Sequence, residues 1–232
     1  MYNKNFAKIY NKDWAWFSEI MAKNVLNLNI KRNSLLDLGC GTGNFLQKVE
    51  NQFDCCIGID LSKSMINIAK KNCKKTQFYV ENVLDFHFDQ KFDLITCNYD
   101  MINHLTSIEE YTIVFKNVFK HLKKNGLFLF DFNTKEYLNN LTTQPNSWEN
   151  DGTIKKAQNT LIDENHAMFS IKVFNKKNKL LASIDEVESF YDYKTIENAL
   201  KEANFNSILF CNKDLHETQN FSAQRLFVMA RK

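Results

Sequence analysis

Glycine is rare in this chain of 232 residues, and its distribution is the feature that most constrains the fold. Of the six glycines, three stand at positions 39, 41 and 43. Glycine is needed where the backbone takes a positive φ or where another group must approach the chain closely. Residues 34–38 before this turn have the pattern of a buried strand, and residues 44–49 after it that of a helix start. The sequence therefore predicts a ligand-binding turn between a strand and a helix.

Strand-like and helix-like segments alternate from this turn onward. Ser62 and Ser107 are suitable caps for two helices, and Glu110 completes a capping-box pattern with Ser107. Such alternation predicts an α/β fold with a doubly wound, mostly parallel seven-stranded sheet and helices on both faces. The other expected strands are residues 55–60, 76–80, 92–97, 127–132, 207–211 and 225–230.

The alternation stops after Thr134. A polar stretch, residues 142–152, contains the single proline, Pro145, and strand-like segments follow at residues 160–162, 167–174 and 180–190. We interpret residues 142–191 as an antiparallel β insertion, placed before the last helix (residues 195–203), that covers the substrate site and can move. The chain is then one domain, 1–232, with a helical lead-in at residues 1–30 and a ligand-binding core at residues 34–132.

Composition excludes several classes of function. The 30 lysines and arginines against 27 acidic residues give a net charge of +3, too small for a nucleic-acid footprint. None of the six cysteines forms a C-x-x-C pair, so we expect reduced thiols and no metal site. Residues 1–13 lack a signal-type apolar run, and no stretch approaches the ~18 apolar residues that cross a bilayer. We expect a cytoplasmic protein without membrane or nucleic-acid partners.

Carboxylates beside the glycine turn distinguish between two classes of cofactor. A dinucleotide turn would follow G-x-G-x-x-G, but Asn44 stands at the third glycine position. Asp37 would repel a pyrophosphate and favour a cation, such as the ammonium of an amino-acid moiety. Asp60, at the end of the second strand, can accept both ribose hydroxyls of an adenosine. Leu61 and Met65 can pack on an adenine face or form ordinary helix-start core.

The segment LLDLGCGTGNF (residues 35–45) resembles the first motif of class I S-adenosylmethionine-dependent methyltransferases. IGIDLS (57–62), FDLI (92–95) and LKKNGLF (122–128) agree in register. The family places an acidic residue after the third strand, where this chain has Asn82, whose carbonyl can still accept a hydrogen bond from the adenine amino group. The resemblance implies S-adenosylmethionine as cofactor, bound by Asp37, Gly39, Cys40, Gly41, Gly43, Asn44, Asp60, Leu61, Met65, Asn82, Val83 and Asn98.

Within this superfamily the chain is most similar to small-molecule N-methyltransferases, including the amino-sugar dimethyltransferases. FAKIY (6–10) resembles their lead-in and CNYDMINHL (97–105) their active-site loop, although Asn11 and Asn103 depart from the usual Asp and Gly. The resemblance implies in-line methyl transfer to a small-molecule acceptor, more often at nitrogen. An O-methyltransferase and a catalytically silent S-adenosyl-ligand-binding subunit stay open, as does the choice between monomer and homodimer. The spacing of the glycines disfavours a dinucleotide oxidoreductase, and the absence of an Asn-Pro-Pro-Tyr motif at residues 98–101 disfavours a base methyltransferase.

Three residues are candidates for catalysis. His104 lies in the loop after the fourth strand and can act as a base, since histidine titrates near neutral pH, or it can simply pack beside Leu105. Asp100 can attract an ammonium group, orient His104 or form a turn. Tyr10 can close over the sulfonium or fix the first helix.

Other polar and aromatic residues receive weaker interpretations. Asp131 or Asn133, at the end of the fifth strand, can face substrate. One of Trp14 and Trp16 can cover the donor, although helix packing is the commoner role. We assign no role to three residues in the insertion, interpreted as surface or hairpin residues: His166, Glu186 and Glu188.

Overall fold

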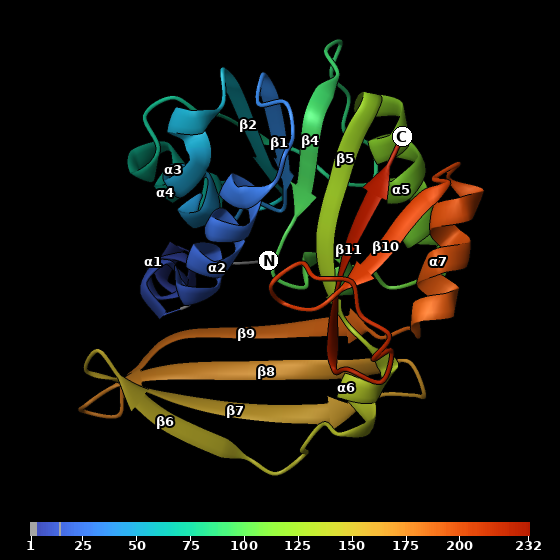
Figure 1. Ribbon diagram of the computed structural model, residues 1–232. Coiled ribbons are helices and arrows are strands. Elements are labelled where there is room, and N and C mark those ends of the chain that lie inside the picture. The colour runs from blue at the N-terminus through green and yellow to red at the C-terminus, as the bar shows by residue number, and fades with distance from the viewer. Residues whose placement is uncertain (1–3, 14) are drawn as a thin grey trace.

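The computed structural model describes residues 4–13 and 15–232, and it consists of a seven-stranded sheet between helices and a separate four-stranded sheet (Figure 1). The carboxyl ends of the parallel strands point toward the four-stranded sheet, which lies across that edge of the molecule. The site that this fold creates is therefore expected between the two sheets.

The large sheet has the order β10-β11-β5-β4-β1-β2-β3. β11 runs antiparallel to both of its neighbours, and the strand pairs β1–β2, β1–β4, β2–β3 and β4–β5 are parallel. These observations confirm the doubly wound, mostly parallel sheet. The strands are β1 (Ser34–Leu38), β2 (Cys55–Asp60), β3 (Gln77–Val80), β4 (Phe92–Cys97), β5 (Leu122–Asn133), β10 (Ser207–Cys211) and β11 (Arg225–Arg231).

The helices begin where the sequence offers side-chain caps. The Ser62 hydroxyl accepts a hydrogen bond from the Met65 N–H at 3.3 Å, and the Ser107 hydroxyl accepts one from Glu110 at the same distance. Asn204 takes the left-handed conformation (φ 74°) just beyond the last helix, the usual alternative to glycine at a helix end. The helices are α1 (Lys4–Asp13), α2 (Ala15–Asn27), α3 (Asn44–Val49), α4 (Lys63–Asn72), α5 (Ile108–His121), α6 (Lys135–Asn139) and α7 (Tyr193–Glu202), with short 3₁₀ turns η1 (Glu50–Gln52) and η2 (Met101–His104).

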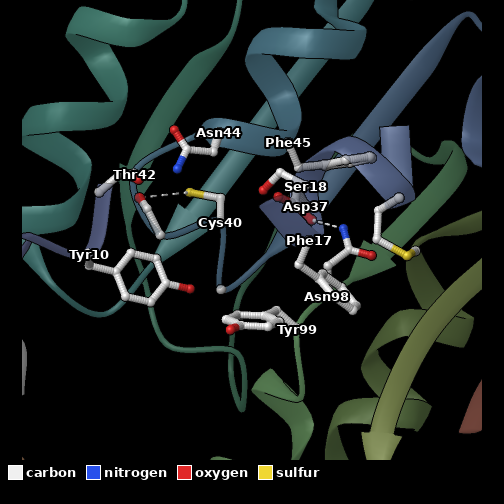
Figure 2. Close-up of a pocket in the computed structure, with 13 residues that line it drawn as sticks. Tyr10, Phe17, Ser18, Asp37, Cys40, Thr42, Asn44, Phe45, Asn98 and Tyr99 are labelled. Carbon is white, nitrogen blue, oxygen red and sulfur yellow. Dashed lines mark hydrogen bonds between the residues drawn. The ribbon is translucent and has the colours of Figure 1, made fainter. Parts of the chain in front are cut away.

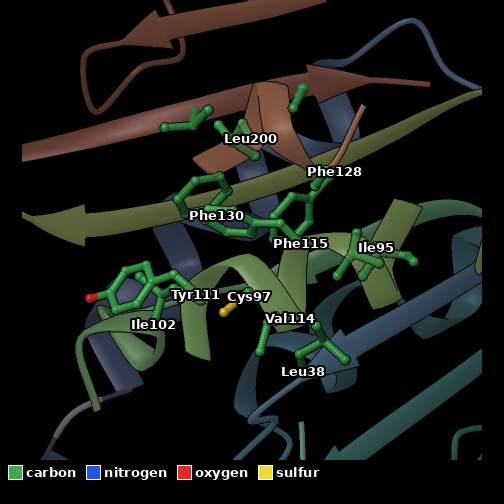
Figure 3. Close-up of a cluster of buried hydrophobic side chains, with 14 of the residues drawn as sticks. Leu38, Ile95, Cys97, Ile102, Tyr111, Val114, Phe115, Phe128, Phe130 and Leu200 are labelled. Atoms are coloured by element: carbon green, nitrogen blue, oxygen red, sulfur yellow. The ribbon is translucent and has the colours of Figure 1, made fainter. Parts of the chain in front are cut away.

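Alternate strand residues build two apolar layers, one on each face of the large sheet. Leu36 and its same-face neighbours pack against α5 and α7, where Phe115 contacts the ring of Phe130 (Figure 3). Leu35 faces the opposite layer with α2, α3 and α4. Truncating a fully buried phenylalanine such as Phe115 to alanine would lower the free energy of unfolding by about 3–5 kcal/mol. Packing of this kind on both faces of the sheet fixes the positions of the strand ends.

The insertion forms four antiparallel strands, whereas the sequence indicated three. They are β6 (Asn146–Asn150), β7 (Thr153–Leu161), β8 (His166–Asn175) and β9 (Leu180–Ser189), in that spatial order. β6 was hidden in the polar stretch because it is an edge strand whose residues are all exposed, so no apolar alternation marks it. α6 was also missed, since five residues are too few to show a helical period.

A buried polar cluster fastens the insertion to the core. The Asn103 amide donates to the Asn133 carbonyl at 2.9 Å and to the Ser189 carbonyl at 2.7 Å. The Ser189 hydroxyl donates to the Leu105 carbonyl at 2.6 Å. η2, the end of β5 and the end of β9 therefore form one packed unit, because breaking any of these bonds would leave a buried polar group unpaired.

Candidate active site

Three adjoining cavities lie at the carboxyl ends of the strands, near the point between β1 and β4 where the strand order changes direction. The loop cavity is lined by Tyr10, Phe17, Ser18, Met21, Asp37, Gly39, Cys40, Gly41, Thr42, Asn44, Phe45, Asn98 and Tyr99. The β2 cavity is lined by Gly39, Asp60, Leu61, Ser62, Asn82, Val83, Leu84, Met101, His104, Leu105, Thr106, Glu110, Asp185, Glu186 and Val187. The insertion cavity is lined by Phe6, Tyr10, Tyr99, Asp100, His104, Phe169, Ile171, Ile184, Glu186 and Glu188.

Shared lining residues show that the three cavities adjoin one another, and we refer to them together as the cleft. Gly39 lines the loop and β2 cavities, while Tyr10 and Tyr99 line the loop and insertion cavities. His104 and Glu186 line both the β2 and the insertion cavities. A ligand that spans the loop and β2 cavities would thus present its middle to the insertion cavity.

The glycine turn is required by conformation and by packing. Gly39, Gly41 and Gly43 have φ of 64°, 53° and 76°, which L residues rarely adopt. A Cβ on Gly39 would lie 2.2 Å from the Met101 Cγ atom. Gly43 lines none of the three cavities, and its missing Cβ instead lets α3 approach Ala69 on α4. Gly43 therefore has a role in helix packing, and its expected contact with the cofactor stays a prediction.

Asp37 is almost fully buried at the end of β1 and faces the loop cavity. Its Oδ1 atom accepts hydrogen bonds from the Thr96 hydroxyl at 2.6 Å and from the Asn98 amide at 3.2 Å, the second drawn in Figure 2. Burial raises the pKa of Asp37 to about 7, although these two hydrogen bonds oppose the shift. A cationic group in the loop cavity would favour the ionised carboxylate.

Two other polar atoms in the loop cavity indicate that it fits a polar ligand. Asn98 Oδ1 and Thr42 Oγ1 are buried and have no hydrogen-bond partner among the described residues. Leaving such a group unpaired costs about 1–3 kcal/mol, which a ligand with matching donors and acceptors would recover. The amino-acid part of S-adenosylmethionine provides both kinds of group.

Asp60 is held rigidly between the glycine turn and α4. Its two oxygens accept hydrogen bonds from the Gly41 N–H at 2.9 Å and the Ser62 N–H at 2.7 Å. Each oxygen keeps a second acceptor position, so the pair can still receive two ribose hydroxyls. Burial raises the pKa of Asp60, opposed by the Ser62 and Gly41 hydrogen bonds.

The expected adenine residues separate into two groups. Leu61, Asn82 and Val83 line the β2 cavity, although the Asn82 carbonyl already accepts a hydrogen bond from the Leu84 N–H at 3.1 Å. Met65 is only 1% exposed and lines none of the three cavities, so its ordinary core role is the correct interpretation.

Cys40 and Asn44 line the loop cavity, and their contact with the cofactor stays a prediction. Burial raises the pKa of the Cys40 thiol well above its ordinary value, which keeps the thiol protonated. The Asn44 amide donates to the Asn11 carbonyl at 3.2 Å and ties the turn to α1.

The interpretations of the acidic residues near the acceptor side need correction. The Asp100 Oδ2 atom accepts hydrogen bonds from Asn133 at 2.7 Å and from Arg225 at 2.6 Å, so this carboxylate does not orient His104. Glu186 is the carboxylate beside His104, with 3.9 Å between Glu186 Oε2 and His104 Nδ1.

Glu186 and Glu188 are not surface residues, because both line the insertion cavity. Burial raises the pKa of Glu188 well above its ordinary value, and the neighbouring Asp100 and Glu186 raise it further. The sequence did contain a signal for this. Along β9, Ala182 and Ile184 are buried, and side chains two residues apart share a face, so Glu186 and Glu188 continue the inward row.

Of the remaining candidates that the structure describes, only Tyr10 lines the cavities. Tyr10 lies between the loop and insertion cavities, beside Tyr99 (Figure 2), and burial raises the pKa of its phenol well above the ordinary value. Trp16 is 57% exposed with its ring edge-on to Tyr99, and Trp14 lies outside the described residues. His166 pairs with Asp163 at the surface, as expected. The described residues contain no group of three or more metal-ligating side chains, and none of their helices is long and apolar enough to cross a membrane.

Comparison with known proteins identifies the family. A model described as a methyltransferase domain matches residues 14–209. The chain belongs to this methyltransferase family. Its fold matches an S-adenosylmethionine-dependent methyltransferase from Clostridium acetobutylicum ATCC 824 with a TM-score of 0.81 and 25% identity, covering 97% of each chain. The matched family and this neighbour support S-adenosylmethionine as the cofactor of this methyltransferase domain.

Curated relatives match over shorter regions. A putative methyltransferase from Geobacillus sp. (strain WCH70) is 30% identical over 122 residues, 51% of this chain and 49% of that protein. The dTDP-4-amino-2,3,4,6-tetradeoxy-D-glucose N,N-dimethyltransferase of Saccharopolyspora spinosa is 25% identical over 138 residues, 56% of this chain and 55% of that protein. The chain thus spans about half the length of the curated relatives that it matches.

Proposed function

We propose that this methyltransferase transfers the methyl group to the nitrogen of a small amine. The observation that carries the proposal is the wall of the insertion cavity, where Asp100, Glu186 and Glu188 meet beside the expected position of the donor methyl group. A cationic acceptor would favour the ionised form of a carboxyl group whose ionisation is opposed by burial, as at Glu188, whereas an anionic acceptor would oppose it further. The named N,N-dimethyltransferase relatives act on amines and support the same assignment.

The cofactor supplies a methyl group already activated by a sulfonium charge, so the protein mainly has to align the reactants and exclude water. Asp37 and Asn98 would hold the amino-acid end in the loop cavity. Asp60 would hold the ribose, and Leu61 and Val83 would flank the adenine in the β2 cavity. Tyr10 would close the cleft between donor and acceptor.

An amine that arrives as ammonium must lose a proton before its lone pair can attack. We assign the removal of this proton to His104, which lies where the β2 and insertion cavities meet. Glu186, 3.9 Å away, would stabilise the imidazolium that forms. The neutral nitrogen then forms its bond to the methyl carbon as the carbon–sulfur bond breaks, and the donor leaves as S-adenosylhomocysteine.

Two alternatives remain testable. A malonyl-[acyl-carrier protein] O-methyltransferase from Bacillus anthracis is 30% identical over 151 residues, 60% of this chain and 54% of that protein, which favours oxygen as a second candidate acceptor atom. A silent binding subunit would have the donor cavities without turnover.

The free thiols of six cysteines support a reducing, cytoplasmic setting. A monomer or homodimer without nucleic-acid or membrane partners completes the proposal.

Methyl transfer from labelled S-adenosylmethionine distinguishes these functions. The acceptors should be matched sets in which one carbon skeleton carries an amine, a hydroxyl or a carboxylate. We expect product only from amines. Preferential methylation of the hydroxyl or carboxylate members would contradict the proposal, and tight donor binding without any product would indicate a silent subunit.

A further inference from the structure

Two consecutive residues in the loop after β4 adopt a backbone conformation that non-glycine residues avoid. Tyr99 and Asp100 have φ of 63° and 48°, so both lie in the left-handed region. Non-glycine residues in sparsely populated regions cost on the order of 1–3 kcal/mol each and persist only where the surroundings enforce them. We call these two residues the elbow.

Asp131 holds the elbow through the backbone N–H groups of its two residues. Its carboxylate accepts hydrogen bonds from the Tyr99 N–H at 2.6 Å and from the Asp100 N–H at 3.0 Å. Asp131 itself is fully buried at the end of β5. Both backbone donors of the elbow are therefore satisfied by one side chain.

Arg225, at the start of β11, completes the arrangement. Its guanidinium donates to Asp131 at 2.7 Å and to Asp100 at 2.6 Å. The same group lies 5.5 Å from the centre of the Tyr99 ring and 5.2 Å from that of Phe17. Arg225 thus contacts the elbow through its carboxylate and its ring while it neutralises the buried Asp131.

The elbow forms a wall of both halves of the active site. Tyr99 lines the loop and insertion cavities, and Asp100 lines the insertion cavity. The chain then enters η2, which carries Met101 against Gly39 and His104 between the β2 and insertion cavities. A change in the elbow would consequently displace donor and acceptor contacts together.

We propose that Asp131 and Arg225 are positioning residues that clamp the elbow in its left-handed conformation and thereby align the methyl donor with the acceptor. The effect on turnover rests on the proposed methyl transfer, whereas the effect on donor-site geometry does not. Neither residue lines any of the three cavities.

The test replaces Arg225 by lysine and by methionine. Lysine can reach one carboxylate as a point charge but cannot bridge two, and methionine removes the charge while it keeps much of the length. We expect kcat to fall in the order Arg, Lys, Met, by about 100-fold for Arg225→Met, the scale for a small misalignment of reactants. S-adenosylhomocysteine should bind about 3- to 10-fold more weakly to Arg225→Met, as expected for a displaced aromatic wall.

The pH dependence of kcat supplies a readout that a purely structural role would not change. Burial raises the pKa of Asp131 to about 6, and Arg225 opposes that shift. Without Arg225 the carboxyl protonates at higher pH and loses an acceptor for the elbow. The acid limb of the kcat profile should therefore move to higher pH by at least about one unit in Arg225→Met, if Asp131 acts on the elbow.

Lys123→Met is the matched control. Lys123 pairs with the nearly buried Asp93 at 2.8 Å, at the opposite end of the same sheet. This variant should lower the melting temperature to a similar extent. It should leave kcat, its pH profile and S-adenosylhomocysteine binding within about twofold of the wild type, because an ion pair that lies far from the site affects stability alone. Equal kinetic effects in Lys123→Met and Arg225→Met, or no kinetic effect in Arg225→Met, would overturn the clamp. If the wild type transfers no methyl group to any amine, the proposed function fails, and selective weakening of S-adenosylhomocysteine binding in Arg225→Met still decides the clamp.

Discussion

Asp37→Asn should stabilise the ligand-free protein while it weakens donor binding. Both hydrogen bonds that Asp37 accepts, from Thr96 and Asn98, end on the same oxygen, and an asparagine carbonyl can accept both. The substitution therefore keeps the packing and removes only the option of carrying a negative charge. This makes it a clean test of what that charge does.

The magnitude follows from the pKa. Burial raises the pKa of Asp37 from 3.8 to about 7, so the folded state binds the proton more tightly than the unfolded chain does. The stabilisation from this proton is complete below about pH 4 and is lost as pH rises through 7. Between pH 5 and pH 8 the wild type loses up to about 3 kcal/mol from this group, at 1.36 kcal/mol per pKa unit, and the variant does not.

Denaturant unfolding at pH 5 and pH 8 measures this difference, with a charge-neutralised control at Asp93. Burial of Asp93 favours the neutral form, but hydrogen bonds from Lys123 and Ser34 outweigh it and lower the pKa. Asp93→Asn should therefore destabilise the protein at pH 8, the opposite sign to Asp37→Asn. An advantage of Asp37→Asn that is equal at both pH values, or absent at pH 8, would refute the reasoning.

The cost of Asp37→Asn appears in the donor site. Losing the hydrogen bond that the ammonium of the methyl donor gives to the charged Asp37 carboxylate costs about 1.5–3 kcal/mol, or about 10- to 100-fold in Kd. For the wild type, calorimetry should show S-adenosylmethionine binding weaken as pH falls below 7, since the cation favours the ionised form. The variant should bind weakly at every pH.

Three further predictions concern the rest of the cleft. Asp60→Ala should weaken donor binding by about 1–3 kcal/mol in calorimetry, and unchanged Kd would show that Asp60 does not hold the ribose. His104→Asn should lower kcat by about 10²–10⁴-fold, remove a limb of the pH–rate profile and leave donor affinity nearly constant; retained activity would return His104 to a packing role. The backbone amides of β6 and β7 should exchange hydrogen faster than those of β9, which the buried Ser189 cluster anchors. Their exchange should slow when donor and acceptor bind. Uniformly slow exchange without a ligand effect would exclude a mobile cover.

The elements that the sequence predicted are those whose signals are local. The turn after β1 was evident from three glycines, and each now has a positive φ. The caps at Ser62 and Ser107 and the left-handed Asn204 also depend only on residues a few positions away. The assignments of Asp37 to the amino-acid end of the cofactor and of Asp60 to its ribose also rest on local sequence, and they stay predictions.

The contacts that the sequence did not predict join residues far apart in the chain. Arg225 and Asp131 are separated by 94 residues, and Glu186 meets His104 only because β9 returns across the carboxyl ends of the strands. No periodic pattern encodes such a meeting. Glu186 and Glu188 could nevertheless have been assigned to the inward face of β9 by counting in twos from Ile184.

The pKa values of partly and fully buried carboxyl groups shift in opposite directions at the two ends of the large sheet. This difference indicates the position of the site independently of any motif. Near the amino ends, hydrogen bonds outweigh burial at Asp93 and at Glu50, and both pKa values fall. Toward the carboxyl ends burial prevails at Asp37 and Asp131, whose pKa values rise to about 7 and about 6. Carboxylates whose ionisation is opposed by their surroundings lower stability at neutral pH, so they are expected mainly where a bound cation or a constrained backbone uses the charge. The ammonium of the methyl donor would pair with the negative charge of Asp37, and the elbow and Arg225 bind the negative charge of Asp131. Substitutions that remove either charge should therefore reduce turnover, even where they stabilise the protein.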